Sequence, residues 1–145
     1  MPETPHAPAL IRTLPSWLLG RAAARGRALV AEALAAEGLR MWHHVVLAAT
    51  CDHQPVAQAE LARSVALDPK DVVGILNDLE GDGYVRRAPD PADRRKNAVS
   101  LTPEGERLLA RCAAAAERAN DALLEGFTAR ERADFLAMLE RAARL

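Results

Sequence analysis

Basic side chains concentrate in one short segment of the chain, residues 84–101. The segment contains five basic residues and two acidic ones, Asp90 and Asp93. Its local net charge is therefore +3, whereas the net charge of the whole chain is −1. The five are Arg86, Arg87, Arg94, Arg95 and Lys96. Such a cluster can bind the phosphate backbone of a nucleic acid, and arginine is attracted to the negative potential of a narrow minor groove. A solvated loop that is charged only for solubility is the alternative interpretation.

The overall composition excludes other modes of nucleic-acid binding. The chain has 145 residues and nearly balanced charge, so it is not uniformly basic. Aromatic residues make up only 3%, which disfavours a stacking surface for single strands. Hydrophobic residues make up 50%, and this content predicts one globular domain.

The remaining chemistry-bearing residues form no catalytic or metal-binding pattern. The sequence contains no nucleophile motif, phosphate-binding loop or zinc-protease motif, so neither an enzyme nor a cofactor is expected. His43 and His44 are adjacent and lie about 100° apart on a helix, so they do not readily share one ion. His53 completes no recognisable zinc pattern, and no metal site is expected.

The cysteines and the apolar runs indicate the compartment. Cys51 and Cys112 are widely separated, and no disulfide framework is predicted. The sequence shows no signal-peptide pattern and no apolar run of about 20 residues, which favours a cytoplasmic protein.

The elements that must position the basic segment are mostly helices. After a flexible arm at residues 1–9, apolar spacing predicts helices at about 14–37, 39–51 and 58–65. Asp68 and Pro69 begin a fourth helix that ends near residue 81, because they supply a side-chain cap and a suitable first residue. Two short strands, 84–87 and 98–101, flank the charged loop. A long helix from Pro103 and a last helix after a capping box at 128–131 complete the order α-α-α-α-β-β-α-α.

A short helix, a capped helix and then a hairpin form the layout of a winged helix-turn-helix. The major groove is about 12 Å wide and admits one helix, while the preceding helix crosses the DNA backbone. The hairpin loop can then reach the neighbouring minor groove. We therefore expect a mainly α fold with a small β-hairpin, organised around residues 69–81 as the recognition helix.

Four segments resemble the MarR family of bacterial transcription regulators: Gln58–Ala62, Leu79–Val85, Asp90–Arg95 and Leu101–Gly105. The resemblance implies a single domain at residues 10–145, with a winged module at about 53–102 and dimerisation helices at about 10–37 and 103–145. It also implies a homodimer that binds an inverted repeat in double-stranded DNA. Such a regulator usually acts as a repressor that a small ligand or an oxidant relieves.

The resemblance also implies roles for individual residues of the wing. Arg95 would enter the minor groove with Asp93 holding it, while Arg94 and Lys96 would contact phosphates. Arg86 and Arg87 lie at the base of the hairpin, and Arg87 matches a position that is often basic.

The outward face of the expected recognition helix carries unusual residues for base readout. It presents Lys70, Asp71, Val73, Gly74, Asn77 and Asp78. Arginine on guanine is the commonest specific contact, yet this helix contains no arginine. Asn77 could instead pair with adenine, and Val73 could contact a thymine methyl group. The two aspartates would repel phosphates unless they cap the helix or pair with a cation.

Effector contacts are expected near the junction of the dimer helices and the winged module. Trp17, Trp42, His43 and His44 are the candidates for a site that takes an aromatic or anionic small molecule. The two tryptophans can also be ordinary core or interface residues. Two further functions stay open: a helical dimer that senses a small molecule or protein without binding DNA, and a thiol-based redox sensor acting through Cys51.

Overall fold

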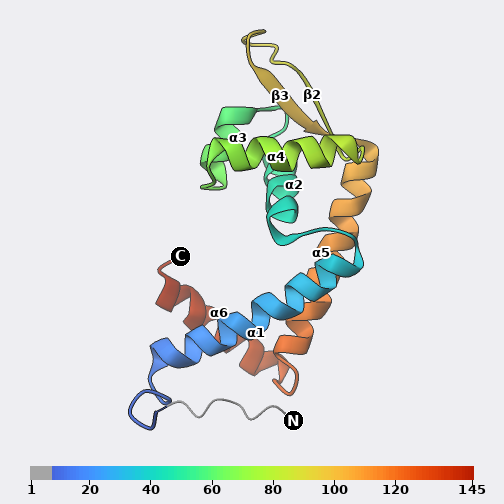
Figure 1. Cartoon of the computed structure of the whole chain (residues 1–145). Helices are drawn as coiled ribbons and strands as arrows, with labels where there is room; N and C mark the ends of the chain where they lie inside the picture. Colours follow the sequence, from blue (N-terminus) through green and yellow to red (C-terminus); the bar gives the residue numbers. More distant parts are fainter. Residues whose placement is uncertain (1–7) are drawn as a thin grey trace. The chain divides into compact units, whose positions relative to one another are not determined.

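The computed structural model describes residues 8–145, which form a mainly helical fold with one small sheet (Figure 1). Of the flexible arm expected at residues 1–9, residues 1–7 lie outside the described part of the chain. In chain order, the elements are α1 (Pro15–Ala36), α2 (Met41–His53), β1 (Val56–Ala57), α3 (Gln58–Ser64), α4 (Pro69–Gly81), β2 (Val85–Pro89), β3 (Asn97–Leu101), α5 (Pro103–Leu123) and α6 (Ala129–Ala143). The expected winged helix-turn-helix order is confirmed.

The described chain forms two compact units. The winged unit comprises Ala31–Ala116, and the helical unit comprises the described residues up to Val30 together with Glu117–Leu145. The division between the units falls within α1 and within α5.

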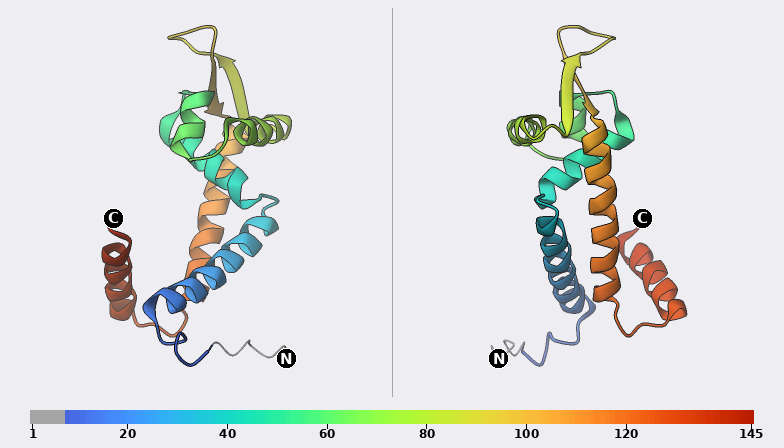
Figure 2. Two further views of the ribbon diagram at one scale, coloured as in Figure 1. Left: turned by 60° about the vertical axis from the view of Figure 1, so that its left-hand side comes forward. Right: turned by 90° about the vertical axis from the view of Figure 1, so that its right-hand side faces the viewer.

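The sheet of the winged unit has three antiparallel strands in the order β1-β3-β2. The hairpin strands pair from Val85 opposite Leu101 to Pro89 opposite Asn97. The sequence pattern does not predict β1, whose two residues pair Val56 with Val99 and Ala57 with Ala98. Both views in Figure 2 show the β2–β3 loop extending beyond the helices of this unit.

Apolar side chains from the sheet and from α2, α3, α4 and α5 form the core of the winged unit. The fully or almost fully buried residues include Leu47, Leu61, Leu76, Leu79, Val85, Val99 and Leu108. Helix α4 contributes Val72, Ile75, Leu76 and Leu79, at the spacing of one helical face. Because that face is buried, the opposite face of α4 is presented to solvent.

Helix α4 begins with the side-chain cap and the proline that the sequence predicts. The Asp68 carboxylate accepts a hydrogen bond from the Lys70 N–H at 2.8 Å, and Pro69 occupies the first turn. The carboxylate satisfies one of the backbone donors that have no partner within a helix, and the ring of Pro69 fixes a helical φ.

Replacing Asp68 with alanine is expected to lower the free energy of unfolding by about 1 kcal/mol, because the cap acceptor is lost. Asp68→Asn retains an oxygen acceptor and should stay close to the wild type. Urea unfolding followed by circular dichroism measures both changes. Equal stability of the alanine variant and the wild type would show that the cap does not contribute.

The helical unit is joined by polar contacts and carries exposed apolar side chains. The Arg25 guanidinium donates to the Leu123 carbonyl at 2.9 Å, and the Phe127 and Phe135 rings lie 5.5 Å apart. The expected capping box at the start of α6 is present, with Thr128 and Glu131 each accepting from the other's N–H. Exposed apolar residues of the unit include Leu14, Leu18, Leu19, Leu136 and Met138. None of the described helices is both long and apolar enough to cross a membrane.

Candidate nucleic-acid interface

The tip of the wing holds an arginine that is both exposed and oriented. Asp93 Oδ1 accepts from the Arg95 backbone N–H at 3.1 Å and from Arg95 Nε at 3.2 Å. The side chain of Arg95 is nevertheless 91% exposed. The hydrogen bond from the Arg95 side chain holds the pKa of Asp93 below its ordinary value, so this contact is lost as pH falls through that lowered pKa. The structure thus brings into contact the two residues to which the family resemblance gives a shared role.

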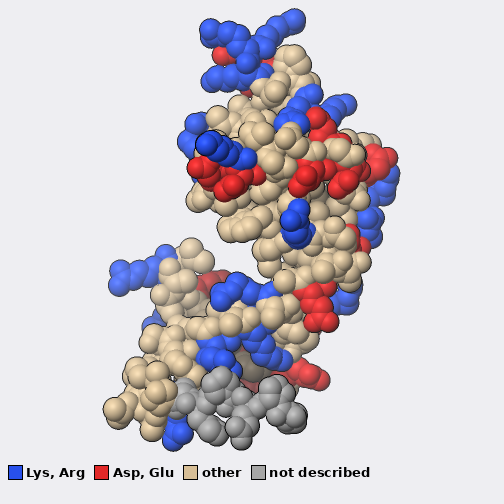
Figure 3. Space-filling view, in the orientation of Figure 1, with Lys and Arg blue, Asp and Glu red and all other residues tan. Residues whose placement is uncertain are grey.

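The loop between β2 and β3 is closed by backbone hydrogen bonds. The Asp90 N–H donates to the Lys96 carbonyl at 2.8 Å, and the Lys96 N–H donates to the Asp93 carbonyl at 3.0 Å. Arg94 and Lys96 are exposed on this loop, and Arg86 is exposed on β2. Lys and Arg atoms accordingly gather at this end of the winged unit (Figure 3). The arrangement supplies several cations on one closed loop.

Arg87, at the base of the wing, is held against α4. Its Nη2 atom donates to Glu80 Oε1 at 2.9 Å and to Asn77 Oδ1 at 2.7 Å, and its side chain is only 18% exposed. The Arg87 backbone N–H also donates to Glu80 Oε2 at 3.0 Å. These hydrogen bonds, the side-chain one most strongly, lower the pKa of Glu80. Sequence reasoning placed Arg87 and Asn77 in the same interface but did not predict their contact.

The outward face of α4 is exposed as expected, and its acidic residues are compensated. Lys70, Asp71, Val73, Gly74, Asn77 and Asp78 are all exposed. Asp78 Oδ2 lies 2.9 Å from His43 Nε2 and 3.5 Å from Arg40 Nη2. Asp71 lies in the first turn of α4, where the helix dipole favours a negative charge. Asp78 therefore meets one of the two expected conditions by pairing, whereas the capping role belongs to Asp68 and not to Asp71.

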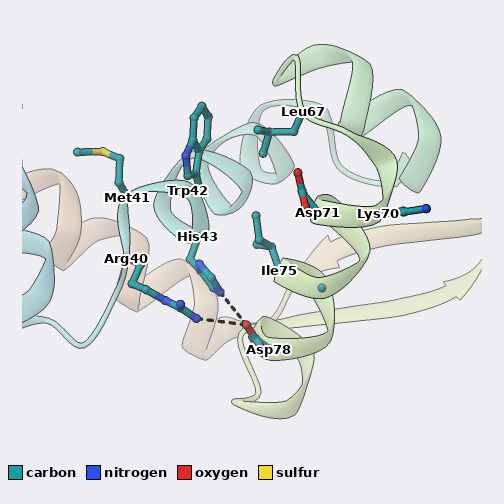
Figure 4. A pocket seen from close by; sticks show the side chains of 10 residues that line it. Arg40, Met41, Trp42, His43, Leu67, Lys70, Asp71, Ile75 and Asp78 are labelled. Atoms are coloured by element: carbon teal, nitrogen blue, oxygen red, sulfur yellow. Dashed lines mark hydrogen bonds and ion pairs between the residues drawn. The ribbon is translucent and has the colours of Figure 1, made fainter.

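A cavity of about 690 Å³ separates the start of α2 from α4. Trp42, His43, Ile75 and Asp78 are among the residues that line it, and Arg40 and His43 point toward Asp78 (Figure 4). Trp42 is 52% exposed, so its ring is available to a ligand. His43 Nδ1 is buried and has no hydrogen-bond partner among the described residues. The cavity therefore offers an aromatic face and the paired charges of Arg40 and Asp78 beside α4.

The other two expected effector residues lie elsewhere. Trp17 belongs to the helical unit, where the Arg21 guanidinium lies 5.7 Å from the centre of its ring. His44 is half-buried outside the lining of the cavity, and its burial lowers its pKa. The structure thus brings together Trp42 and His43 from the expected set of four.

Arg63 is an exposed basic residue near the wing that sequence reasoning did not single out. It is exposed on α3 and lines a second cavity of about 340 Å³ together with Lys96 and Asn97 from the wing. The helix before the recognition helix crosses the DNA backbone in this class of motif. Its position on the helix expected at residues 58–65, which precedes the recognition helix, could have indicated a phosphate contact from the sequence.

The two cysteines differ in exposure, and this bears on the thiol-sensor hypothesis. Cys51 is exposed, whereas Cys112 is buried and its pKa is raised, mainly by burial. Within the described residues, no group of three or more His, Cys, Asp or Glu side chains is placed to hold a metal ion.

Comparisons with known proteins agree with this geometry. The family model described as "MarR family" matches residues 37–96. The repressor NicR of Pseudomonas putida is 36% identical over 97 residues, which cover 67% of this chain and 61% of NicR. The repressor Rv2887 of Mycobacterium tuberculosis is 31% identical over 125 residues, which cover 86% of this chain and 90% of Rv2887. For NicR, therefore, the match spans less than two thirds of the relative's length.

Solved structures of the same mycobacterial protein share the fold. Rv2887 in complex with DNA has a TM-score of 0.75 at 30% identity, covering 94% of this chain and 98% of that chain. Rv2887 in complex with p-aminosalicylic acid has a TM-score of 0.72 at 29% identity, covering 94% and 99%. With the winged helix-turn-helix order, the basic wing and a relative matched over most of its length, this chain belongs to the MarR family.

Proposed function

We propose that this protein is a transcriptional repressor that binds an inverted repeat in double-stranded DNA as a homodimer and is released by a small-molecule effector. The observation that carries the DNA-binding part is the wing tip, where Asp93 orients Arg95 while leaving 91% of its side chain exposed. Repression is supported by the two relatives, both of which are named repressors. The regulator would act in the cytoplasm, where bacterial DNA lies.

In the proposed complex, α4 enters the major groove and the wing enters the adjacent minor groove. Lys70 and Asn77 lie on the exposed face of α4, and the exposed basic residues Arg94 and Lys96 of the wing and Arg63 of α3 would contact phosphates. Because the helix has no arginine for a guanine contact, a large share of the affinity comes from the wing and from the phosphate backbone. Part of the specificity then comes from the shape of the operator.

A second copy of this chain is the proposed partner of the helical unit. Leu18 is 49% exposed, Leu136 is 51% exposed and Met138 is 60% exposed, which is unusual for so many large apolar residues in a small domain. Their burial in a dimer would place two recognition helices about 34 Å apart, one turn of DNA. That spacing matches an inverted repeat.

The effector is proposed to be a small aromatic compound that binds between α2 and α4. The half-exposed Trp42 ring and the Arg40 guanidinium, which both line this cavity, support this class of ligand. The complex of Rv2887 with p-aminosalicylic acid supports it independently. A compound in this cavity would contact the side of the recognition helix that carries Asp71 and Asp78.

Fluorescence anisotropy over a salt series tests the DNA-binding proposal. The DNA would come from upstream of the protein's own gene, with an unrelated duplex of equal length as the control. We expect tighter binding to the first DNA and a linear fall in log affinity with log salt. Sequences enriched from a random duplex library would test for an operator elsewhere. Absence of binding to any DNA at low salt would favour the non-DNA-binding dimer.

Tryptophan fluorescence can locate the effector, because the chain contains only two tryptophans. We expect p-aminosalicylic acid or a related aromatic acid to quench the emission of Trp17→Phe, which retains Trp42. The same compound should leave the emission of Trp42→Phe largely unchanged. The reverse pattern would move the binding site to the helical unit.

A further inference from the structure

We propose that Arg87 is a positioning residue that sets base specificity through Asn77 without contacting DNA itself. In this proposal, Arg87 fixes the Asn77 amide so that Asn77 acts as a hydrogen-bond donor in the major groove and reads guanine in preference to adenine. The inference rests on the proposed DNA binding. It assigns to the wing base a part in base recognition.

The geometry ties the amide of Asn77 to the wing. Arg87 Nη2 lies 2.7 Å from Asn77 Oδ1 and 2.9 Å from Glu80 Oε1. Asn77 and Glu80 are three residues apart on α4 and therefore lie on the same side of the helix. Glu80 also accepts the Arg87 backbone N–H at 3.0 Å, which anchors the strand as well as the side chain.

The guanidinium determines which way the amide turns. Arginine offers only hydrogen-bond donors, so it can face the oxygen of Asn77 but not its amino group. An exposed asparagine without such a neighbour can present either atom by rotating its terminal torsion. Here Oδ1 is turned to Arg87, and the Nδ2 amino group is left as the free end of an exposed residue on the outward face of α4.

The orientation of the amide bears directly on the base that is read. The usual asparagine contact with adenine uses both the oxygen and the amino group, one accepting from N6 and the other donating to N7. Arg87 already occupies the oxygen, which weakens the adenine contact. Guanine presents two acceptors, O6 and N7, to the major groove and needs only a donor. Asn77 in this setting is therefore suited to guanine.

Burial argues against a direct phosphate contact by Arg87. Its side chain is 18% exposed, whereas that of Arg95 at the wing tip is 91% exposed. Both acceptors would lose a charged partner if the guanidinium swung out toward DNA, and such hydrogen bonds are stronger than neutral ones. Arg87 thus remains against α4 while the tip residues contact DNA.

Selection from a random duplex library tests the proposal, using the full-length wild type, Asn77→Ala, Arg87→Ala and Arg87→Lys. The base pair whose preference disappears in Asn77→Ala identifies the position that Asn77 reads. At that position the wild type should prefer guanine, and Arg87→Ala should shift the preference toward adenine by about tenfold. Arg87→Lys keeps a charged end group that offers only donors, so its shift toward adenine should be smaller than that of Arg87→Ala.

Two controls separate positioning from other roles. Arg86→Ala removes the same charge from the neighbouring strand residue and should reduce the salt dependence of binding without changing the base preference. Arg87→Ala should leave the salt slope unchanged, whereas loss of a phosphate contact would reduce it by about one unit per site. Urea unfolding of each variant measures any general loss of stability.

Each outcome decides the proposal. Adenine preference in the wild type, an unchanged preference in Arg87→Ala, or a reduced salt slope in that variant would overturn it. Side-chain amide resonances of Asn77 in the DNA-free protein give a separate readout, since Arg87→Ala should shift them and Arg86→Ala should not. If the protein binds no DNA, the proposed function fails, while these resonances still test whether Arg87 orients the amide.

Discussion

Replacing Arg95 with alanine is expected to weaken specific DNA binding by about tenfold or more. The Arg95 side chain is 91% exposed, and Asp93 accepts from its guanidinium Nε and from its backbone N–H. A well-oriented contact of this kind is worth about 1–3 kcal/mol, and a dimer has two wings. The slope of log affinity against log salt should fall by about two, one for each wing.

Two companion variants identify the source of the loss. Arg130→Ala removes one positive charge from the first turn of α6, far along the chain from the wing, and should leave affinity and slope nearly unchanged. Asp93→Ala keeps the Arg95 charge but removes the group that orients it, so an intermediate loss is expected. Equal affinities for Arg95→Ala and the wild type in fluorescence anisotropy would contradict a role for the wing tip.

The second large effect concerns Gly105 in the first turn of α5. A Cβ atom at this position would overlap the Tyr84 carbonyl oxygen and lie 2.9 Å from its carbonyl carbon. That carbonyl accepts the Thr102 N–H at 3.0 Å, and Thr102 Oγ1 donates to the Gly83 carbonyl at 2.6 Å. Because the overlap is with hydrogen-bonded backbone, the structure cannot relieve it by rotating a side chain.

Gly105→Ala is therefore expected to lower the free energy of unfolding by about 1–3 kcal/mol, the range for overpacked sites. Displacement of Tyr84 would also shift the start of β2, so DNA affinity should fall. Gly81→Ala is the matched control, because its Cβ would meet nothing within 4 Å and alanine favours helix by up to about 1 kcal/mol. In urea unfolding, the free energy of unfolding should be highest for Gly81→Ala, intermediate for the wild type and lowest for Gly105→Ala. Wild-type stability for Gly105→Ala would contradict the observed packing.

Features governed by neighbouring residues could be predicted from the sequence. The caps at Asp68 and Thr128 and the pairing of Asp93 with Arg95 each involve residues within three positions of one another, and all three are present. Backbone donors at a helix start always need an acceptor, so a suitable side chain there is informative by itself. The helix order follows from apolar spacing for the same local reason.

Features that depend on distant parts of the chain were missed. Strand β1 has only two residues, Val56 and Ala57, which pair with Val99 and Ala98 of β3. Periodicity carries no information over such a separation in sequence. The contact of Arg87 with Asn77 joins β2 to α4 in the same way. The sequence left open whether Trp42 is a core residue or a ligand contact, whereas the structure leaves it half-exposed at the edge of a cavity.

The short strand β1 has a mechanical consequence for signalling. It immediately precedes α3 and is hydrogen-bonded to β3, while Arg87 of β2 is bonded to α4. The wing is therefore linked to α3 through β1 and to the recognition helix α4 through Arg87, so each helix of the helix-turn-helix has its own connection to the hairpin. A ligand that tilts α4 should swing the loop tip with it, so both grooves would be vacated together. In the proposed repressor, displacement of α4 by an effector would thus weaken the contacts to both grooves at once.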